Sequence, residues 1–253
     1  MKVQNLFNND DVEIIEQNNQ YQVQVLQYKR DLSVTPNQAV NAYFAAQMNC
    51  RKREVAITLN GNMPWTLSAG ALHWMGGHID VKTDVQGVGD FLSKAFNAKV
   101  TGETAVKPVY TGNGLLILEP TYKHLLIVPV SEWGGAITMQ DGLYLASSGD
   151  CKVGAQMIQS ISGATLGREG LFNTMVQGPG VVVIESPVPR QELVEVVLEN
   201  DVLKIDGNYA ICWTSGLQFT VEKATKSIIG SAASGEGLLN VYRGTGRVWI
   251  APK

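Results

Sequence analysis

Three glutamates recur along the chain in similar surroundings, and their spacing is the first feature that could support chemistry. Glu103, Glu169 and Glu236 are separated by 66 and 67 residues. A threefold set of carboxylates would supply the oxygen ligands that hard cations prefer. Each glutamate could instead accept hydrogen bonds from backbone N–H groups of its own glycine-containing turn. Because an active site rarely needs three copies, we favour the structural role.

A Gly-x-Gly pair follows each glutamate after eight or nine residues, beginning at Gly112, Gly178 and Gly244. A dinucleotide-binding loop needs a third glycine and a helix whose N-terminus receives the pyrophosphate. Here short strand-like runs such as Val181–Ile184 follow the pairs, so we interpret the pairs as turns. Asp-Gly dipeptides are a further hairpin signal. The residues predicted to have a structural turn role are Gly102, Glu103, Glu169, Gly170, Gly178, Gly180, Asp206, Gly207, Gly235, Glu236, Gly237, Gly244 and Gly246.

Motifs for metal binding or nucleophilic catalysis are missing from the sequence. His73 and His78 lie close together, but neither their spacing nor any His-x-His pair matches a metal site. Cys50, Cys151 and Cys212 form no Cys-x-x-Cys pair, and no histidine stands beside them. We therefore predict a protein that is not an enzyme, with no catalytic residue, no metal site and no cofactor.

Composition limits the class of partner and the compartment. Only 17% of the 253 residues are charged and the net charge is −3, so a surface that grips nucleic acid is not expected. No apolar run reaches the ~20 residues that span a bilayer, and the N-terminus lacks the apolar core of a signal peptide. With three unpaired cysteines, we predict a cytoplasmic protein with reduced thiols.

The shared period predicts repeated supersecondary units. Within each unit the runs rich in valine and isoleucine are too short for helices and are bounded by glycine turns, which is typical of β-strands. We therefore predict a mainly all-β fold whose residues 57–253 form three β-rich units around a pseudo-threefold axis. The approximate repeats are 57–125, 126–192 and 193–253.

Residues 1–56 are predicted to form a separate N-terminal extension containing strands and a helix. Thr35, Pro36 and Gln38 are typical of a helix start, and a stripe containing Val40, Tyr43 and Phe44 follows. Arg51–Arg53 would place positive charge at the helix C-terminus near residue 50. The polar face carries asparagine and glutamine rather than lysine, so docking on the β body is favoured over a membrane surface.

Several segments resemble the mitochondrial-biogenesis family named for altered inheritance of mitochondria, which has bacterial members of unassigned function. The matching segments are Gly102-Glu103, Glu169–Phe172, Gly178–Gly180, Val202–Gly207, Gly235–Leu238 and Gly244–Val248. The resemblance implies a fold like that of the tryptophan RNA-binding attenuation protein, with three short double-stranded β-helix or β-sandwich units per chain and ring-like trimers. It brings no catalytic residues, and the long N-terminal extension departs from the family's short start.

The functional prediction that follows is a non-catalytic oligomeric scaffold or binding protein, most simply a homotrimer. The scarcity of charges leaves the strand edges of the units to be covered by pairing, which favours self-association. One alternative is a cupin-like small-molecule binder or enzyme with a pocket inside a β unit. Another is an organiser associated with a membrane surface, because the family's mitochondrial members are connected with inner-membrane organisation.

Overall fold

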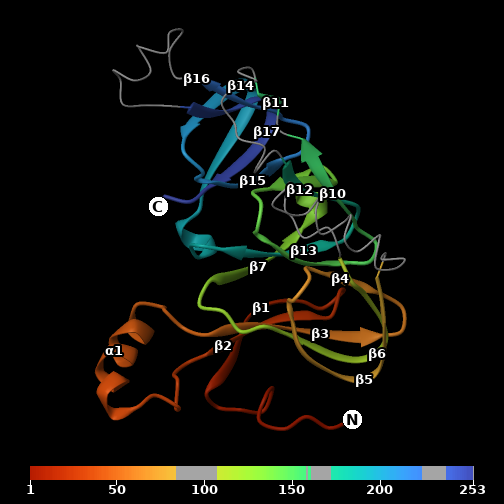
Figure 1. The fold of residues 1–253 in the computed structure, drawn as a ribbon, viewed down its shortest axis with the longest axis vertical. Helices are drawn as coiled ribbons and strands as arrows, with labels where there is room; N and C mark the ends of the chain where they lie inside the picture. The colour runs from red at the N-terminus through yellow and green to blue at the C-terminus, as the bar shows by residue number, and fades with distance from the viewer. Residues whose placement is uncertain (84–106, 158, 161–171, 224–237, 253) are drawn as a thin grey trace, which may run out of the picture.

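The computed structural model describes residues 1–83, 107–157, 159–160, 172–223 and 238–252. The prediction of a mainly β fold is confirmed, since almost all regular structure belongs to two strongly curled sheets (Figure 1). The described helical segments are α1 (Pro36–Gln47) and the short 3-10 turns η1 (Val130–Trp133) and η2 (Arg190–Glu192). Of the predicted turn residues, Gly102, Glu103, Glu169, Gly170, Gly235, Glu236 and Gly237 lie outside the described residues.

The nine-stranded sheet includes the N-terminal strands. Its spatial order is β1 (Val12–Asn18), β2 (Val23–Tyr28), β3 (Arg53–Asn60), β6 (Val109–Leu118), β4 (Trp65–Leu67), β9 (Tyr144–Ser148), β13 (Val181–Ser186) and β7 (His124–Pro129), with β5 (Leu72–Lys82) paired to β6 outside this path. Because β2 pairs directly with β3, one continuous ladder crosses the division predicted at residue 56.

The eight-stranded sheet contains most of the C-terminal half. Its order is β10 (Lys152–Met157), β12 (Phe172–Gln177), β8 (Ala136–Met139), β15 (Ala210–Thr214), β17 (Leu238–Ile250), β16 (Gln218–Lys223) and β11 (Gln159–Ser160), and β14 (Val194–Asp206) pairs with β17 outside this path. Within this sheet β11 and β16 run parallel.

Three strands that carry Gly-x-Gly pairs organise the pairing, and we call each with its partners a unit. In unit one, β6 pairs with β3, β4 and β5. In unit two, the corresponding strand is split by Gly178–Gly180 into β12, which pairs with β8 and β10, and β13, which pairs with β7 and β9. In unit three, β17 pairs with β14, β15 and β16. The split places unit two in both sheets.

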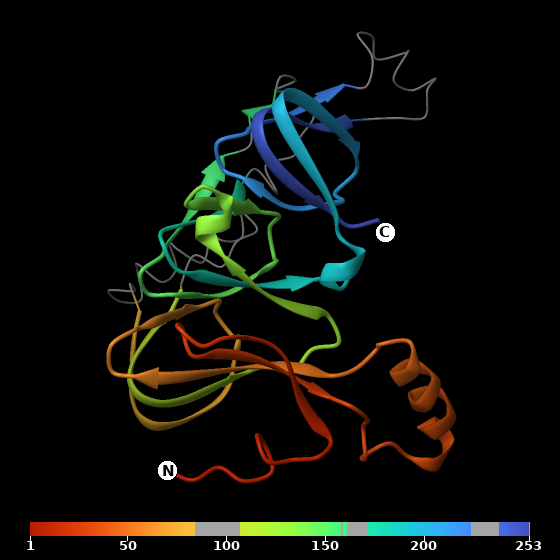
Figure 2. The same cartoon turned by 180° about the vertical axis from the view of Figure 1, so that it is seen from behind.

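Consecutive units are joined by one type of antiparallel pairing. Thr66 of β4 lies opposite Ser147 of β9, which joins unit one to unit two. Thr138 of β8 lies opposite Trp213 of β15, which joins unit two to unit three. No pairing among the described residues returns unit three to unit one, and β5 and β14 lie at opposite ends of the molecule (Figures 1 and 2). The pseudo-threefold axis stays a prediction.

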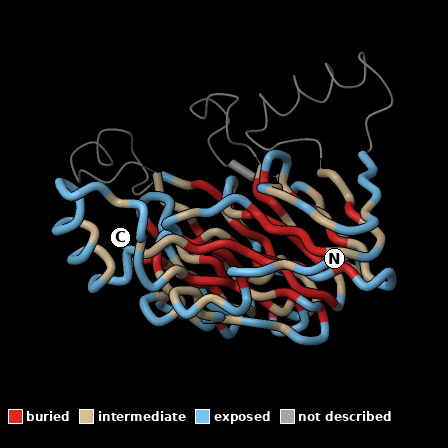
Figure 3. Tube along the Cα trace, turned by 90° about the horizontal axis from the view of Figure 1, so that it is seen from below, coloured by how far each residue is buried: buried red, intermediate tan, exposed pale blue. Residues whose placement is uncertain are grey.

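The core follows the same succession of units. One cluster combines unit-one residues such as Trp65 with Val183 of unit two, and a second combines unit-two residues with Trp249 of unit three. Figure 3 shows these buried segments running through the middle of the sheets. Val181–Ile184 is almost completely buried, and each such side chain contributes roughly 1.5–3 kcal/mol to folding. Burial therefore holds the units together as well as each unit separately.

Helix α1 lies beside the sheets rather than against them (Figures 1 and 3). Gln38 Oε1 accepts a hydrogen bond from the Thr35 backbone N–H at 3.3 Å, and Pro36 occupies the first turn, as predicted. The predicted apolar stripe does not dock on the β body, because Val40, Tyr43 and Phe44 are 62–65% exposed. The smaller Ala42, Ala45 and Ala46 are the half-buried helix residues, so that expectation is corrected.

Candidate functional site

The Gly-x-Gly pairs form sharp corners at equivalent places in the three units. Gly112, Gly178 and Gly244 have φ of +118°, +144° and +119°, a region that residues with a side chain rarely adopt. A Cβ at Gly112 would overlap the backbone carbonyl oxygen of His78, and a Cβ at Gly178 would overlap that of Asp150. The corners thus bring two backbone segments into direct contact. Asp206 ends β14, and the adjacent Gly207 also has positive φ, +79°.

A buried polar cluster lies under the corner of unit two. Ser148 Oγ donates to Asp150 Oδ1 at 2.5 Å and accepts from the Val181 backbone N–H at 3.0 Å. Tyr21 Oη donates to Asp150 Oδ2 at 3.0 Å and to the Pro179 carbonyl at 3.1 Å. Burial and the hydrogen bond to Asp150 raise the pKa of Tyr21 to about 12. The cluster therefore connects the N-terminal region to the corner of unit two.

This cluster contains groups that could act in catalysis, but its packing opposes that role. Cys151 Sγ lies 3.8 Å from Ser148 Oγ, and burial raises the pKa of the Cys151 thiol, which disfavours the reactive thiolate. Even a methyl group at Gly180 would overlap Ser148 Oγ and Asp150 Oδ1. A substrate has no space beside these atoms. The polar groups fix the corner.

The same hydroxyl contact recurs in unit three. Thr214 Oγ1 accepts from the Arg247 backbone N–H at 3.1 Å, and both residues lie 66 positions after their counterparts Ser148 and Val181. Gly76 occupies the corresponding place in unit one, facing Gly114. These polar residues are not identifiable as a site from the sequence, because Tyr21 and Asp150 are 129 residues apart. Extending the 66-residue period to Ser148 and Thr214 is the available signal.

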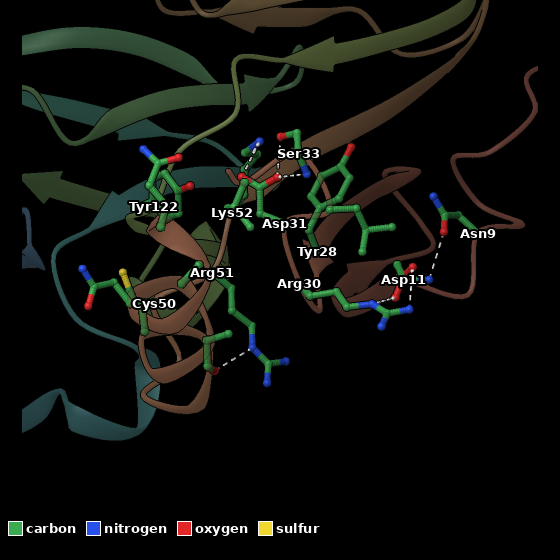
Figure 4. Close-up of a pocket in the computed structure, with 17 residues that line it drawn as sticks. Asn9, Asp11, Tyr28, Arg30, Asp31, Ser33, Cys50, Arg51, Lys52 and Tyr122 are labelled. Carbon is green, nitrogen blue, oxygen red and sulfur yellow. Dashed lines mark hydrogen bonds and ion pairs between the residues drawn. The ribbon is translucent and has the colours of Figure 1, made fainter. Parts of the chain in front are cut away.

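A cleft of about 790 Å³ separates α1 from the ends of the N-terminal strands (Figure 4). Arg30 holds Asp11 through two contacts, Nε–Oδ1 at 2.7 Å and Nη2–Oδ2 at 3.3 Å. Asp31 accepts from the Ser33 hydroxyl at 2.6 Å and from the Ser33 backbone N–H at 2.9 Å, and these hydrogen bonds lower the pKa of Asp31. The acidic groups of the cleft are thus already engaged.

The remaining cations of the cleft also have partners. Lys52 Nζ lies 3.9 Å from Asp31 Oδ2 and 5.9 Å from the centre of the Tyr28 ring. Arg51 Nη1 lies 3.4 Å from Glu13 Oε1, while its Nε donates to the Ala46 carbonyl at 3.0 Å. None of the described residues that line this cleft is a histidine. The cleft therefore has the volume for a small ligand without a nucleophile and base in contact.

Tyr28 and Cys50 are the other reactive groups of this cleft. Tyr28 Oη donates to Glu54 Oε1 at 2.7 Å, and burial together with this hydrogen bond raises the pKa of Tyr28. The Cys50 thiol is exposed at the end of α1. A phenol held in its neutral form and an isolated thiol give no reaction a defined acid, base and nucleophile.

Arg53 fastens the C-terminal end of α1 to the strands, although it is only 1% exposed. Its Nη1 donates to the carbonyl oxygens of Arg51, Tyr122 and Lys123 at 3.0–3.4 Å. Its Nη2 donates to the backbone and side-chain oxygens of Asn49 at 2.8 and 2.7 Å. Carbonyls at a helix C-terminus stabilise a cation, as the sequence predicts for Arg51–Arg53. Burial lowers the pKa of Arg53.

Neither a metal centre nor a membrane-spanning helix is found in the described part of the chain. Its His, Cys, Asp and Glu residues form no group of three that could hold a metal ion. None of its helices combines the length and apolar character needed to cross a membrane. What the described geometry provides is a set of rigid corners and one charge-balanced cleft.

Comparison with known proteins gives the family. The family model described as "Mitochondrial biogenesis AIM24" matches residues 47–253. The chain belongs to the AIM24 family. The resemblance stated from the sequence is thereby confirmed at the level of the family, whereas the likeness to the tryptophan RNA-binding attenuation protein stays a prediction. The match begins within α1, so β1 and β2 lie outside it.

Two bacterial proteins illustrate how AIM24 sequences and folds extend beyond mitochondria. An uncharacterized protein of Streptococcus pyogenes serotype M6 is 24% identical over 192 residues, which cover 73% of this chain and 75% of that protein. A crystal structure of a protein from Streptococcus pyogenes has a TM-score of 0.60 at 22% identity, covering 81% of this chain and 90% of the other. This second likeness shows a shared fold.

Proposed function

We propose that this AIM24 protein is a non-catalytic, self-associating scaffold or binding protein. One observation carries the proposal: β5 and β14 are long strands at opposite ends of the chain, and each is paired along one edge alone among the described residues. An open strand edge presents unpaired backbone N–H and C=O groups that favour pairing with another chain. The molecule thus has one open edge at each end of its row of units.

The polar sites support a non-catalytic role. The groups under the corner of unit two are hydrogen-bonded in a space too tight for a methyl group at Gly180. The charged groups of the α1 cleft neutralise one another. Catalysis needs a group with a matched pKa within reach of a reacting atom, and the described clefts offer none. The cupin-like binder and the membrane-surface organiser stay alternative predictions.

A homotrimer is the assembly we propose. A contact between different surfaces of successive copies either closes into a ring or grows into a filament. The family resemblance implies a closed ring of three chains, in line with three similar units in each chain. A chain mass of 27.4 kDa makes the trimer readily distinguishable from a monomer or dimer.

Light scattering coupled to size exclusion, over a range of protein concentrations, tests this proposal. We expect a mass about three times 27.4 kDa. A monomer at every concentration would overturn the scaffold. The variant Phe44→Ser is the matched control, because Phe44 is exposed on α1, far from the strand edges of β5 and β14. Dissociation by Phe44→Ser would transfer the interface to the helix and contradict the edge-based scaffold.

A further inference from the structure

The two joints between units inside the chain share a defined register. Thr66 and Thr138 provide one side of the joints, and Ser147 and Trp213 provide the other. The first pair of positions is identified by the central strand of each unit: Thr66 lies opposite Val109, and Thr138 lies opposite Met175, which is 66 residues later. One side of the joint therefore occupies a fixed position in its unit.

The other side of the joint is equally well defined. Ser147 lies opposite Val182, and Trp213 lies opposite Val248, again 66 residues later. A register shift interrupts the same pairing close by in both units. An equivalent shift occurs in β5 between Leu72 and Trp74. The three units thus share the local distortion as well as the pairing.

Each side of the joint has one counterpart that remains unpaired. Continuing the 66-residue step, Lys204 lies opposite Val241 and corresponds to Thr138. Stepping back from Val182, Met75 lies opposite Leu116 and corresponds to Ser147. Lys204 belongs to β14 at one end of the molecule and Met75 to β5 at the other end (Figure 2). A single chain cannot bring these two edges together in this structure.

The side chains at these two edges repeat the alternation of the joints that are formed. Leu203 is half-buried and Ile205 is 8% exposed, flanking the exposed Lys204, just as Trp65 and Leu67 are buried on either side of Thr66. Met75 is 43% exposed. Both edges therefore present the same inward and outward faces as the paired strands.

We propose that Trp74–Gly76 of one copy pairs in antiparallel fashion with Leu203–Ile205 of a second copy, placing Met75 opposite Lys204. The inference rests on the proposed self-association and names the surface that produces it. The partner is a second copy of this chain, because the complementary edge with the matching register is found at its other end. Met1, whose side chain covers Gly76 and is 77% exposed, can move aside without loss of buried contacts.

A disulfide between copies tests this register directly. The double variant Met75→Cys, Lys204→Cys is made with Cys50→Ser, because Cys50 is the exposed native thiol, whereas Cys151 and Cys212 are buried. Opposite residues in antiparallel strands have Cβ atoms about 4.5–5.5 Å apart, close enough for a disulfide after a small adjustment. Mild oxidation should give covalent dimers and trimers on a non-reducing gel.

Matched variants keep the outcome interpretable. Each single cysteine variant should give no chain longer than a dimer, and Thr66→Cys, Ser147→Cys should form a bond within one chain without increasing its mass. If light scattering shows an oligomer but the double variant gives no higher species, the register is wrong while the scaffold stands. If the unmodified protein is monomeric at every concentration, the scaffold itself fails.

The charge at position 75 gives a second, non-covalent readout. A glutamate opposite Lys204 is a favourable cross-strand pair, and a lysine there is unfavourable. We expect Met75→Lys to weaken association two- to five-fold relative to Met75→Glu, and Lys204→Glu to reverse that order. An order that does not change with Lys204→Glu would contradict direct contact between these two positions. Circular dichroism of each variant checks that the sheets are intact.

Discussion

The Gly-x-Gly corners and the α1 cleft are held by opposite kinds of interaction. At the corners, backbone meets backbone, and the neighbouring side chains are buried. At the cleft, the helix has no buried residue, and exposed or half-exposed ion pairs hold the surrounding loops. Close packing cannot absorb an added atom, whereas exposed ion pairs contribute about 0–1 kcal/mol each. We therefore expect substitutions to be costly at corners and tolerated at the cleft.

The three corners also differ among themselves. Gly178 and Gly112 face a backbone carbonyl oxygen, while a Cβ at Gly244 would meet only Leu217 Cδ2 at 3.6 Å. All three share positive φ. The comparison thus separates two costs, the strained backbone conformation common to all corners and the overlap found at the first two. The four predictions below start from the corner with both costs and end at the helix.

Gly178→Ala should have the largest effect. The alanine must adopt φ of +144° and its Cβ overlaps the Asp150 carbonyl oxygen, so we expect a loss of about 3–5 kcal/mol in the free energy of unfolding. Urea denaturation measures it. Gly244→Ala carries the conformational cost without the overlap and should lose about 1–2 kcal/mol. Equal losses in the two variants would contradict the distinction between the corners.

The buried hydroxyl under the second corner comes next. Ser148→Ala leaves the Val181 N–H and Asp150 without their partner in a fully buried position, so we expect a loss of about 2 kcal/mol. Thr214→Val removes the same contact to Arg247 at a half-buried position in unit three and should lose about 1 kcal/mol. Thermal unfolding of both variants gives the comparison. A larger loss from Thr214→Val would reverse our ranking of the two corners.

Sequence patterns identify the strands and the glycine corners, since both depend on local residue type. The run Val181–Ile184 predicts a buried strand, and Gly178 and Gly244 predict a break in pairing, which the structure places at equivalent corners. The family was also recognisable from such segments. These features need no knowledge of distant neighbours, which is why a single sequence predicts them.

Features that depend on long-range contacts could not be predicted. Tyr21 reaches Asp150 across 129 residues, and nothing in the composition of either segment indicates that contact. The α1 stripe illustrates the opposite difficulty. Its periodicity predicts an amphipathic helix but does not say whether a surface within the same chain will cover it, and the structure leaves Tyr43 and Phe44 exposed. The cleft beside it arises from tertiary placement of α1, not from a motif.

The ion pair beside the third corner should have a smaller, pH-dependent effect. Glu222 accepts hydrogen bonds from Arg243 and Thr220, which lower its pKa to about 2. A carboxylate with a lowered pKa in the folded state stabilises the fold above its unfolded pKa of about 4.3, and this contribution is lost as pH falls toward 2. Allowing for solvent screening, Glu222→Gln should lose about 1 kcal/mol at pH 7.

Measuring unfolding of Glu222→Gln at several pH values tests that sign. The difference from the unmodified protein should shrink between about pH 5 and pH 2, because the native carboxylate becomes protonated over that range. Arg30, whose pair with Asp11 lies at the cleft, provides the matched control. Arg30→Gln should change stability by less than Glu222→Gln, since the Arg30 side chain is 66% exposed. A constant difference across this pH range would contradict the role assigned to Glu222.

Phe44→Ser should have the smallest effect on the folded chain. An apolar side chain buried against the β body would cost about 3–5 kcal/mol when removed, but Phe44 is 63% exposed, and its ring contact is with Tyr43 of the same helix. We expect a change within about 0.5 kcal/mol, the usual range for surface positions. Urea denaturation at low protein concentration, where self-association is minimal, isolates this value. Ala45→Ser, on the half-buried side of the helix, is the control for altered helix propensity. If Phe44→Ser destabilises the protein by several kcal/mol while Ala45→Ser does not, α1 packs through its aromatic stripe, and the contrast between a rigid corner and a tolerant cleft fails at the helix.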